Sequence, residues 1–260
     1  MPLPPLAIDP NEVFPHLSRA PITEAVIQIS TRAEAAWVEA NVLDRLKELL
    51  PDYPQENLQR GIVQSFTVHF GPDAPPVDAP PEEPVTWTGV TLKSADAHYV
   101  AKFSREAFSC SRLKPYEHWP TFLAETMRLW RIHREIAQPS SIQRVGLRFI
   151  NAIDLPESHA DLSDYLVNPP PAAHGFPLPM QGFVRHDLLG VPGHPYHVNY
   201  IQTIQPSPQR AGLAIIVDID VFTVGETEPE QLEVHLAKMR WLKNKLFFGT
   251  VTEKALQRLR

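Results

Sequence analysis

The stretch Gly212-Leu-Ala-Ile-Ile-Val-Asp-Ile-Asp-Val-Phe222 decides how this sequence folds. Successive side chains of a strand point to opposite faces, so one face here is purely apolar: Leu213, Ile215, Val217, Ile219 and Val221. The opposite face carries two carboxylates, Asp218 and Asp220, between apolar neighbours. The pattern predicts a half-buried strand of an antiparallel sheet.

The residues around this strand predict the rest of the second half. Alternating apolar residues indicate three more strands, over 141–153, 180–188 and 196–204. A short helix is expected over 160–166, with Asp161 near its start. A long helix should begin at about residue 229, because apolar residues recur there with helical spacing: Leu232, Leu236, Met239, Leu242 and Leu246.

The first half has the same order of elements. A strand over 25–29 precedes a helix over 34–50, which Pro51 ends. Strands then follow, over 61–70, 84–93, 97–104 and 106–112. A second helix is expected from Pro115 to about residue 136. Prolines, 28 in all, cluster between these elements and indicate stiff loops.

Together these patterns predict an α+β protein made of two β-α-β(3–4)-α halves. We expect curved antiparallel sheets, separate or continuous, backed by two long helices. Residues 1–20 form an N-terminal extension, 21–138 the first half and 139–260 the second half of one compact unit.

An internal duplication would explain the repeated order. The segment Met127-Arg-Leu-Trp130 of the first long helix corresponds to Met239-Arg-Trp-Leu242 of the second. The element order also resembles the repeated unit of the TATA-binding protein, although a shared topology implies nothing about DNA binding. Coincidence between two common α+β patterns is the alternative.

Composition limits the classes of function. The single cysteine, Cys110, excludes a disulfide framework, and no segment reads as a signal peptide or a membrane span. We therefore expect a cytoplasmic protein without a membrane partner. The net charge of −6 argues against a nucleic-acid partner, because duplex binding depends largely on neutralising phosphates.

Several blocks resemble a family of bacterial proteins of similar length. The blocks are 20–26, 108–119, 144–151, 218–220 and 243–248, followed by Thr250 and Glu253. The family is distributed sporadically among bacteria, and its members are known as conserved proteins of unknown function. The resemblance therefore implies no activity, but a scattered distribution implies an accessory role such as defence or toxin neutralisation.

The aspartate pair is the first candidate site. Two carboxylates side by side repel each other and need a cation. Arg144 and Arg148 lie on one face of the strand over 141–153, so we expect Arg148 to pair with an aspartate inside the fold. The alternatives are a divalent metal on Asp218 and Asp220, or a ligand pocket that also includes Asn151.

The block Arg112-Leu-Lys-Pro-Tyr-Glu-His-Trp119 is the second candidate site. Arg, Tyr and Trp often anchor interfaces, which makes Arg112, Tyr116 and Trp119 candidate contacts for a partner. The start of a helix can also bind an anion, although Glu117 would compete. Alternatively, this block only begins a helix and buries Trp119 in the core.

The remaining reactive residues have simple interpretations. Cys110 is expected to be a packed, unreactive thiol, and the histidines near 186–197 to lie on the surface. Lys243-Asn244-Lys245 is interpreted as a solvated helix face, with a partner contact as the alternative. No phosphate-binding loop or dinucleotide fingerprint is present, so we expect no cofactor and no metal.

The sequence shows no catalytic constellation. We therefore expect a non-enzymatic protein-binding or regulatory module of bacteria, whose protein partner is encoded nearby. The alternative is a ligand- or metal-binding enzyme that uses a pocket around Asp218, Asp220 and Arg148.

Overall fold

The computed structural model describes residues 3–61, 86–155, 161–171, 182–208 and 211–260. The first half contains β1 (Ile22–Ala33), α1 (Glu39–Leu49), β2 (Gln55–Gly61), β3 (Thr86–Lys93), β4 (Tyr99–Ser104), β5 (Ala107–Leu113) and α2 (Trp119–Ala137). The second half contains β6 (Pro139–Asp154), η1 (Leu162–Asp164), β7 (Val184–Gly190), β8 (Tyr196–Pro206), β9 (Leu213–Thr223), η2 (Pro229–Gln231), α3 (Leu232–Thr250) and α4 (Glu253–Leu259).

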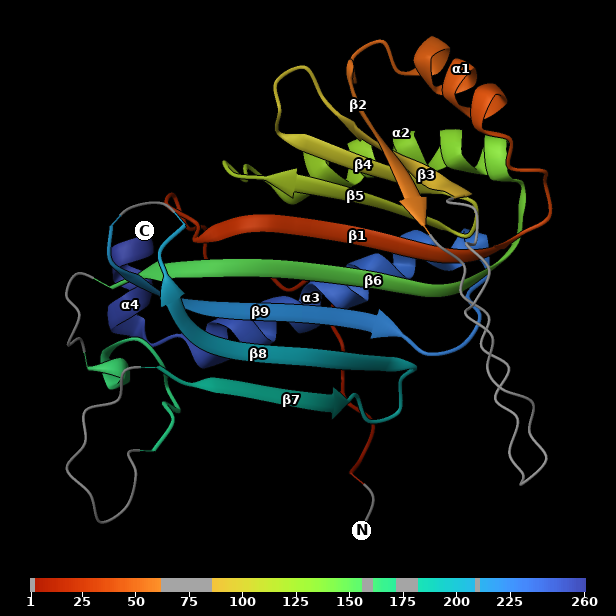
Figure 1. Cartoon of the computed structure of the whole chain (residues 1–260). Coiled ribbons are helices and arrows are strands. Elements are labelled where there is room, and N and C mark those ends of the chain that lie inside the picture. Colours follow the sequence, from red (N-terminus) through yellow and green to blue (C-terminus); the bar gives the residue numbers. More distant parts are fainter. Residues whose placement is uncertain (1–2, 62–85, 156–160, 172–181, 209–210) are drawn as a thin grey trace, which may run out of the picture.

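The strands of the described residues form one antiparallel sheet in the order β2-β3-β4-β5-β1-β6-β9-β8-β7 (Figure 1). The α+β class is confirmed, and the sheets of the two halves are continuous. β1 and β6 pair at the centre, where Ile27 lies opposite Leu147. In each half the last strand of the meander pairs with the first strand, β5 with β1 and β9 with β6.

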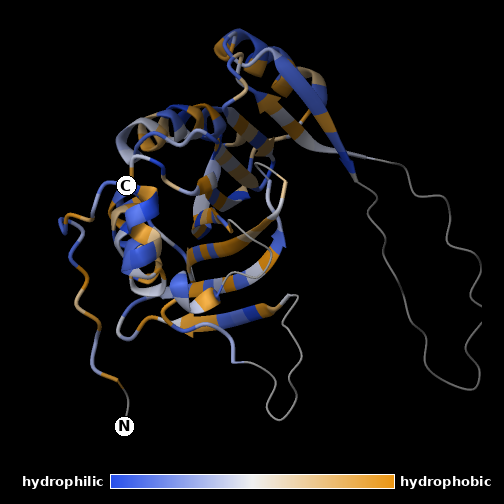
Figure 2. Ribbon diagram, turned by 90° about the vertical axis from the view of Figure 1, so that its left-hand side faces the viewer, coloured by the Kyte–Doolittle hydropathy of each residue, from blue (hydrophilic) through white to orange (hydrophobic). Residues whose placement is uncertain are grey.

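Helices α2 and α3 cover one face of this sheet, on the left in Figure 2. Helix α1 packs on α2 and β3. The core between helices and sheet contains large buried aromatic and aliphatic side chains: Phe103, Phe108, Phe122, Trp130, Phe149 and Tyr196. We call the sheet face away from α2 and α3 the open face.

The register confirms the two faces predicted for the strand over 212–222. The side chains of Ile215, Val217 and Ile219 are buried under the helices. Asp218 and Asp220 lie on the open face, opposite Ile150 and Arg148 of β6. One apolar and one mixed face is what period-two alternation requires of this strand.

Several predicted boundaries were wrong. The helix predicted from Pro115 begins at Trp119, because the Lys114 N–H still donates to the Thr23 carbonyl and holds the chain along β1. Pro120 then occupies the first turn of α2, where its missing N–H costs nothing.

The strand predicted over 61–70 lies almost entirely outside the described residues, and a strand that we did not expect, β2, ends at Gly61. Its sequence, Gln55-Glu-Asn-Leu-Gln-Arg-Gly61, is too polar to be recognised from hydrophobic alternation. The short helix predicted over 160–166 is the single 3₁₀ turn η1. Asp161 caps it by accepting from the Ser163 N–H.

Part of residues 3–21, which we call the N-terminal segment, lies against α3. The Glu12 carboxylate accepts from the Trp241 indole N–H at 2.6 Å and from Lys245 Nζ at 2.6 Å. The Phe14 ring stacks on the Phe248 ring at 5.6 Å. The segment therefore covers a helix face that would otherwise contact water.

Across the described ranges, no helix combines the length and the apolar character needed to cross a bilayer.

Candidate ligand-binding pocket

Arg148 and Asp218 form the ion pair that we expected from the sequence. Arg148 Nε lies 2.9 Å from Asp218 Oδ1, and Nη2 lies 2.5 Å from Oδ2, a two-point contact. The Asp218 side chain is 9% exposed and the Arg148 side chain 46% exposed. The arginine therefore neutralises a nearly buried carboxylate and keeps contact with water.

Asp220 has its own cation beside this pair. Arg144 Nη2 lies 3.3 Å from Asp220 Oδ2, and the Arg144 guanidinium lies over the Phe222 ring at 4.6 Å. Burial raises the pKa of Asp220, and Arg144 opposes that shift. The open face thus balances each aspartate with an arginine.

Within the described part of the chain, no group of three or more His, Cys, Asp or Glu side chains could hold a metal ion. Asn151 does not join the two aspartates in one pocket, so that alternative was wrong. It lies on the helix-covered face, opposite Val217, and its Nδ2 donates to the Val217 carbonyl at 2.9 Å. Asn151 lies three positions after Arg148, an odd difference, which places the two side chains on opposite faces of β6.

The residues of the 112–119 block are packed into the fold. Arg112 is buried, lies over the Tyr99 ring at 4.8 Å and pairs with Glu117 at 3.6 Å. Its guanidinium is therefore not offered to a partner. Tyr116 packs edge-on against Phe149, with 5.5 Å between the ring centroids.

Tyr116, Trp119 and Asn151 meet at a pocket of about 210 Å³ between the start of α2, the helix α3 and the N-terminal segment. Three residues of α3 also contribute to its polar lining: Arg240, which sequence reasoning missed, and Lys243 and Asn244, which it assigned to a solvated face. The structure thus joins two sequence candidates of the 112–119 block to one of β6, and separates all three from Asp218 and Asp220.

Lys243 is the unusual residue of this pocket. The interpretation of Lys243 and Asn244 as a solvated face was wrong, since both side chains are buried. The Lys243 amine lies 4.0 Å over the centre of the Phe149 ring, and it forms no hydrogen bond or ion pair with any described residue. Burial, with Arg240 nearby as a second cause, lowers the pKa of Lys243 to about 7.

The sequence does contain a signal for this burial. Lys243 and Asn244 stand between Trp241-Leu242 and Leu246-Phe247-Phe248, so this part of the helix is apolar nearly all around. A helix with that pattern is covered on more than one side. Here the sheet covers one side and the N-terminal segment covers another.

The other polar groups of the pocket are also available to a ligand. Burial raises the pKa of Tyr116, against a smaller opposing effect of Arg240, so its hydroxyl stays protonated and can donate. The side chains of Tyr116 and Asn244 make no hydrogen bond with a described residue. The pocket therefore combines hydrogen-bond donors and two cations with aromatic walls.

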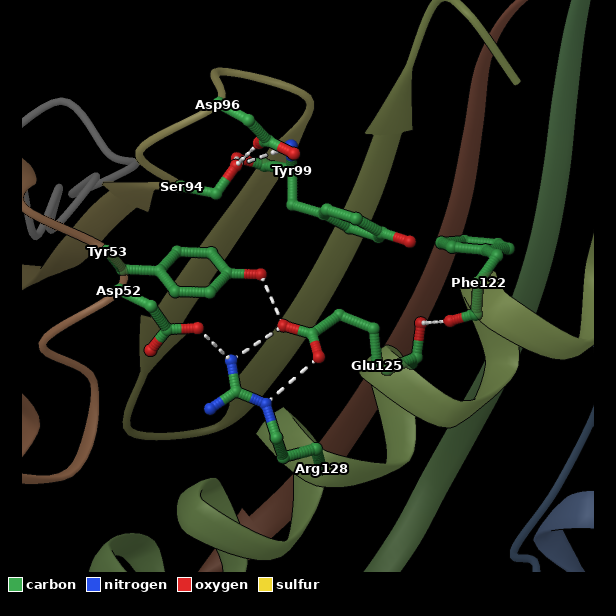
Figure 3. A network of polar contacts seen from close by, with 9 residues as sticks. Asp52, Tyr53, Ser94, Asp96, Tyr99, Phe122, Glu125 and Arg128 are labelled. Carbon is green, nitrogen blue, oxygen red and sulfur yellow. Dashed lines mark hydrogen bonds and ion pairs between the residues drawn. The ribbon is translucent and has the colours of Figure 1, made fainter. Parts of the chain in front are cut away.

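A second polar cluster, around Glu125 of α2, differs because its charges are matched (Figure 3). Glu125 accepts from the Tyr53 hydroxyl at 2.7 Å and from Arg128 Nε at 2.9 Å and Nη2 at 2.7 Å. Arg128 also reaches Asp52 at 2.6 Å. These contacts attach α2 to the turn between α1 and β2, so the cluster has a structural role.

The chain matches no known protein-family model and no curated protein. The family resemblance of the sequence stays a prediction, and the proposal of a function depends on the pocket itself.

Proposed function

We propose that the protein is a binding protein for a small organic anion, which it takes into the pocket at Lys243. The observation that carries the proposal is the Lys243 amine, which is buried in this pocket and has no carboxylate partner among the described residues. Burying a cation without a partner is costly, so such groups are rare unless they serve a ligand or a reaction.

The local contacts do not compensate this charge. A cation over an aromatic face gains about 0.5–2 kcal/mol, less than the cost of removing an ammonium group from water. Arg240, one turn earlier on the same helix, adds a second positive charge. A ligand carboxylate bound at Arg240, close to Lys243, would supply the missing counter-charge.

The dimensions favour a small ligand with an aromatic or apolar body. Pockets for drug-sized ligands hold about 300–1,000 Å³, and this one holds about 210 Å³. Its walls include the rings of Phe14, Trp119 and Phe149. An aromatic acid would place its ring among these side chains and its carboxylate at the cations.

Comparison of the two long helices also supports an anion site. If the halves arose by the duplication that the sequence suggests, Arg240 corresponds to Arg128. Arg128 is paired with Glu125, three residues earlier. The residue three positions before Arg240 is Ala237, so the second helix lacks this carboxylate.

Titration calorimetry with phenyllactate and benzoate tests the proposal. We expect binding by the native protein, and a loss of at least about tenfold in affinity for Lys243→Met. Lys238→Met is the matched control, because Lys238 lies on the same helix outside the pocket. Equal affinities of the native protein and Lys243→Met would contradict the proposal, and so would no binding of either acid.

A protein partner, the function expected from the sequence, is the second candidate. The last strand of the sheet, β7, exposes apolar side chains on the open face: Val184 is 78% and Leu188 63% exposed. No strand of the described residues pairs with its outer edge. An exposed sheet edge of this kind can receive a strand of a partner.

Native mass spectrometry after co-expression with neighbouring genes tests this candidate. A stoichiometric companion that is retained by Val234→Lys, an exposed helix position, and lost by Leu188→Lys would support docking at β7. A companion retained by Leu188→Lys would assign the contact to another surface.

A further inference from the structure

We infer that Lys243 is a nucleophilic amine, which forms an imine with a 2-oxo carboxylic acid bound in its pocket. The inference rests on the proposed function, because it uses the same site and names the class of its ligand. It goes beyond that function by adding a covalent step between the protein and the ligand.

A lysine can attack a carbonyl only when its amine is unprotonated. Desolvation and a neighbouring cation are the two ways in which proteins achieve this at neutral pH. Lys243 has both, since its amine is buried against Phe149 and Arg240 acts on it from one helical turn away. Burial and the charge of Arg240 together lower the pKa of Lys243 to about 7.

The other titratable groups that line the pocket do not restore the charge on Lys243. Glu117 is well exposed and pairs with Arg112. The His118 ring contacts the Thr121 hydroxyl at 2.9 Å. Tyr116 is held in its neutral form by burial. His16, the remaining one, makes no ion pair with a described residue.

The arrangement of the cations points to a carbonyl next to a carboxylate. Arg240 and Lys243 are three residues apart on α3, so both reach the same small volume. A guanidinium binds a carboxylate well through its fork of donors, while the amine of Lys243 is left for the adjacent carbon. A 2-oxo acid places its two functional groups at that spacing.

The step is balanced without a further reagent. The nitrogen lone pair of Lys243 attacks the carbonyl carbon, and the electron pair of the C=O bond moves to the oxygen, which takes up a proton. Tyr116, a protonated hydroxyl in the same pocket, is suited to donate it. As the C=N bond forms, the nitrogen loses its two hydrogens as protons, one of which restores the Tyr116 hydroxyl while the other goes to the oxygen, which leaves as water.

Reductive trapping tests the inference. Native protein is incubated with phenylpyruvate and cyanoborohydride, and the modified lysine is located by peptide mass spectrometry. We expect one adduct, with the mass of the keto acid less one oxygen atom, at Lys243. It should form on the order of a hundredfold faster there than at any other lysine, because ordinary lysines are almost fully protonated at pH 7.

Phenyllactate separates this inference from the proposed function. It has the carboxylate but no carbonyl, so the native protein should bind it without forming an adduct, and bound phenyllactate should slow the trapping of phenylpyruvate at Lys243. The control Lys238→Met should be trapped like the native protein.

Three other outcomes would exclude the imine, the special reactivity of Lys243 or both proposals. If phenyllactate binds and no adduct forms, the imine is excluded while the anion pocket stands. If adducts spread evenly over many lysines, the special reactivity of Lys243 is excluded. If phenyllactate does not bind and no adduct forms, both proposals fail.

Discussion

Lys243 is a buried lysine whose described neighbours compensate its charge only weakly. Its amine lies over the Phe149 ring, and the positive charge of Arg240 disfavours the charged form of the amine. By contrast, Asp218 is nearly buried as well but has an arginine at two points of contact. The Asp218 charge is thus compensated within the fold, whereas we propose that a ligand compensates the charge of Lys243.

Lys243→Met should stabilise the ligand-free protein. Because the folded pKa of about 7 lies below the ordinary value of 10.5, the unfolded chain binds more protons between these values. The stability of the native protein therefore rises with pH over this range. We expect the variant to be more stable by up to about 4 kcal/mol at pH 6, with a smaller difference at pH 10.

Urea unfolding of both proteins at pH 6, 8 and 10 measures this difference. Lys238→Met, a half-buried position of the same helix outside the pocket, should show no comparable change with pH. A difference between Lys243→Met and the native protein that is constant with pH would exclude a lowered pKa for Lys243.

The two partners of the open-face ion pair should differ in their cost on mutation. Arg148→Met leaves the carboxylate of Asp218 nearly buried and unpaired, which should cost about 2–4 kcal/mol. Asp218→Asn keeps a polar side chain beside an arginine that reaches water, which should cost about 1 kcal/mol. Chemical denaturation at pH 7 measures both; equal costs would show that the fold does not bury Asp218 as described.

At the scale of elements, the contacts of Glu125 determine how α2 is attached to the first half. They join the helix to Tyr53 and, through Arg128, to Asp52 in the turn after α1 (Figure 3). Burial disfavours the charged form of Glu125, but the hydrogen bonds from Arg128 and Tyr53 outweigh it, so its pKa is lowered. Burial and Glu125 raise the pKa of Tyr53, which keeps its hydroxyl a donor.

Glu125→Gln should therefore destabilise the protein by about 2–3 kcal/mol at pH 7. A carboxyl with a lowered folded pKa contributes stability above its ordinary pKa of 4.5, and this is lost as the pH falls through the folded value. The variant and the native protein should thus converge in stability toward low pH.

Thermal unfolding between pH 3 and pH 7 checks this expectation. Glu135→Gln is the control, because Glu135 lies on the same helix and forms an exposed pair with Arg45, worth about 0–1 kcal/mol. A similar loss for Glu125→Gln and Glu135→Gln would mean that the cluster does not fasten α2.

At the scale of the whole molecule, the pairing of β1 with β6 joins the two halves. The pairing runs from Ile22 with Asn151 to Ala33 with Pro139, in the centre of the sheet. Separating the halves would expose the hydrogen-bonding groups of both strands, which favours a single cooperative unit.

The whole chain should therefore unfold in one transition. The double variant Trp119→Phe with Trp241→Phe leaves Trp37, Trp87 and Trp130, so its fluorescence reports the first half without the ring that contacts α3. Its urea transition should coincide with that of far-ultraviolet circular dichroism, which reports all elements. A fluorescence midpoint clearly different from the dichroism midpoint would indicate halves that unfold separately.

Local patterns were sufficient for much of the fold. Strand alternation correctly placed Asp218 and Asp220 on one face of β9 and the apolar residues on the other. Charge complementarity then paired Arg148 with Asp218. Both inferences succeed because the direction of a strand side chain, and the need of a carboxylate for a cation, are properties of nearby residues.

The sequence by itself thus determined the α+β class, the faces of β9 and the pairing of Arg148 with an aspartate of the open face. Only the tertiary structure decided that Lys243 and Asn244 are buried and that Tyr116 and Asn151 join them. The side of a helix that meets water depends on which remote segments cover it, and here the cover comes from residues 3–21, at the other end of the chain. Apolar residues around most of this part of the helix indicate a second covering segment, but helical spacing does not identify which segment that is.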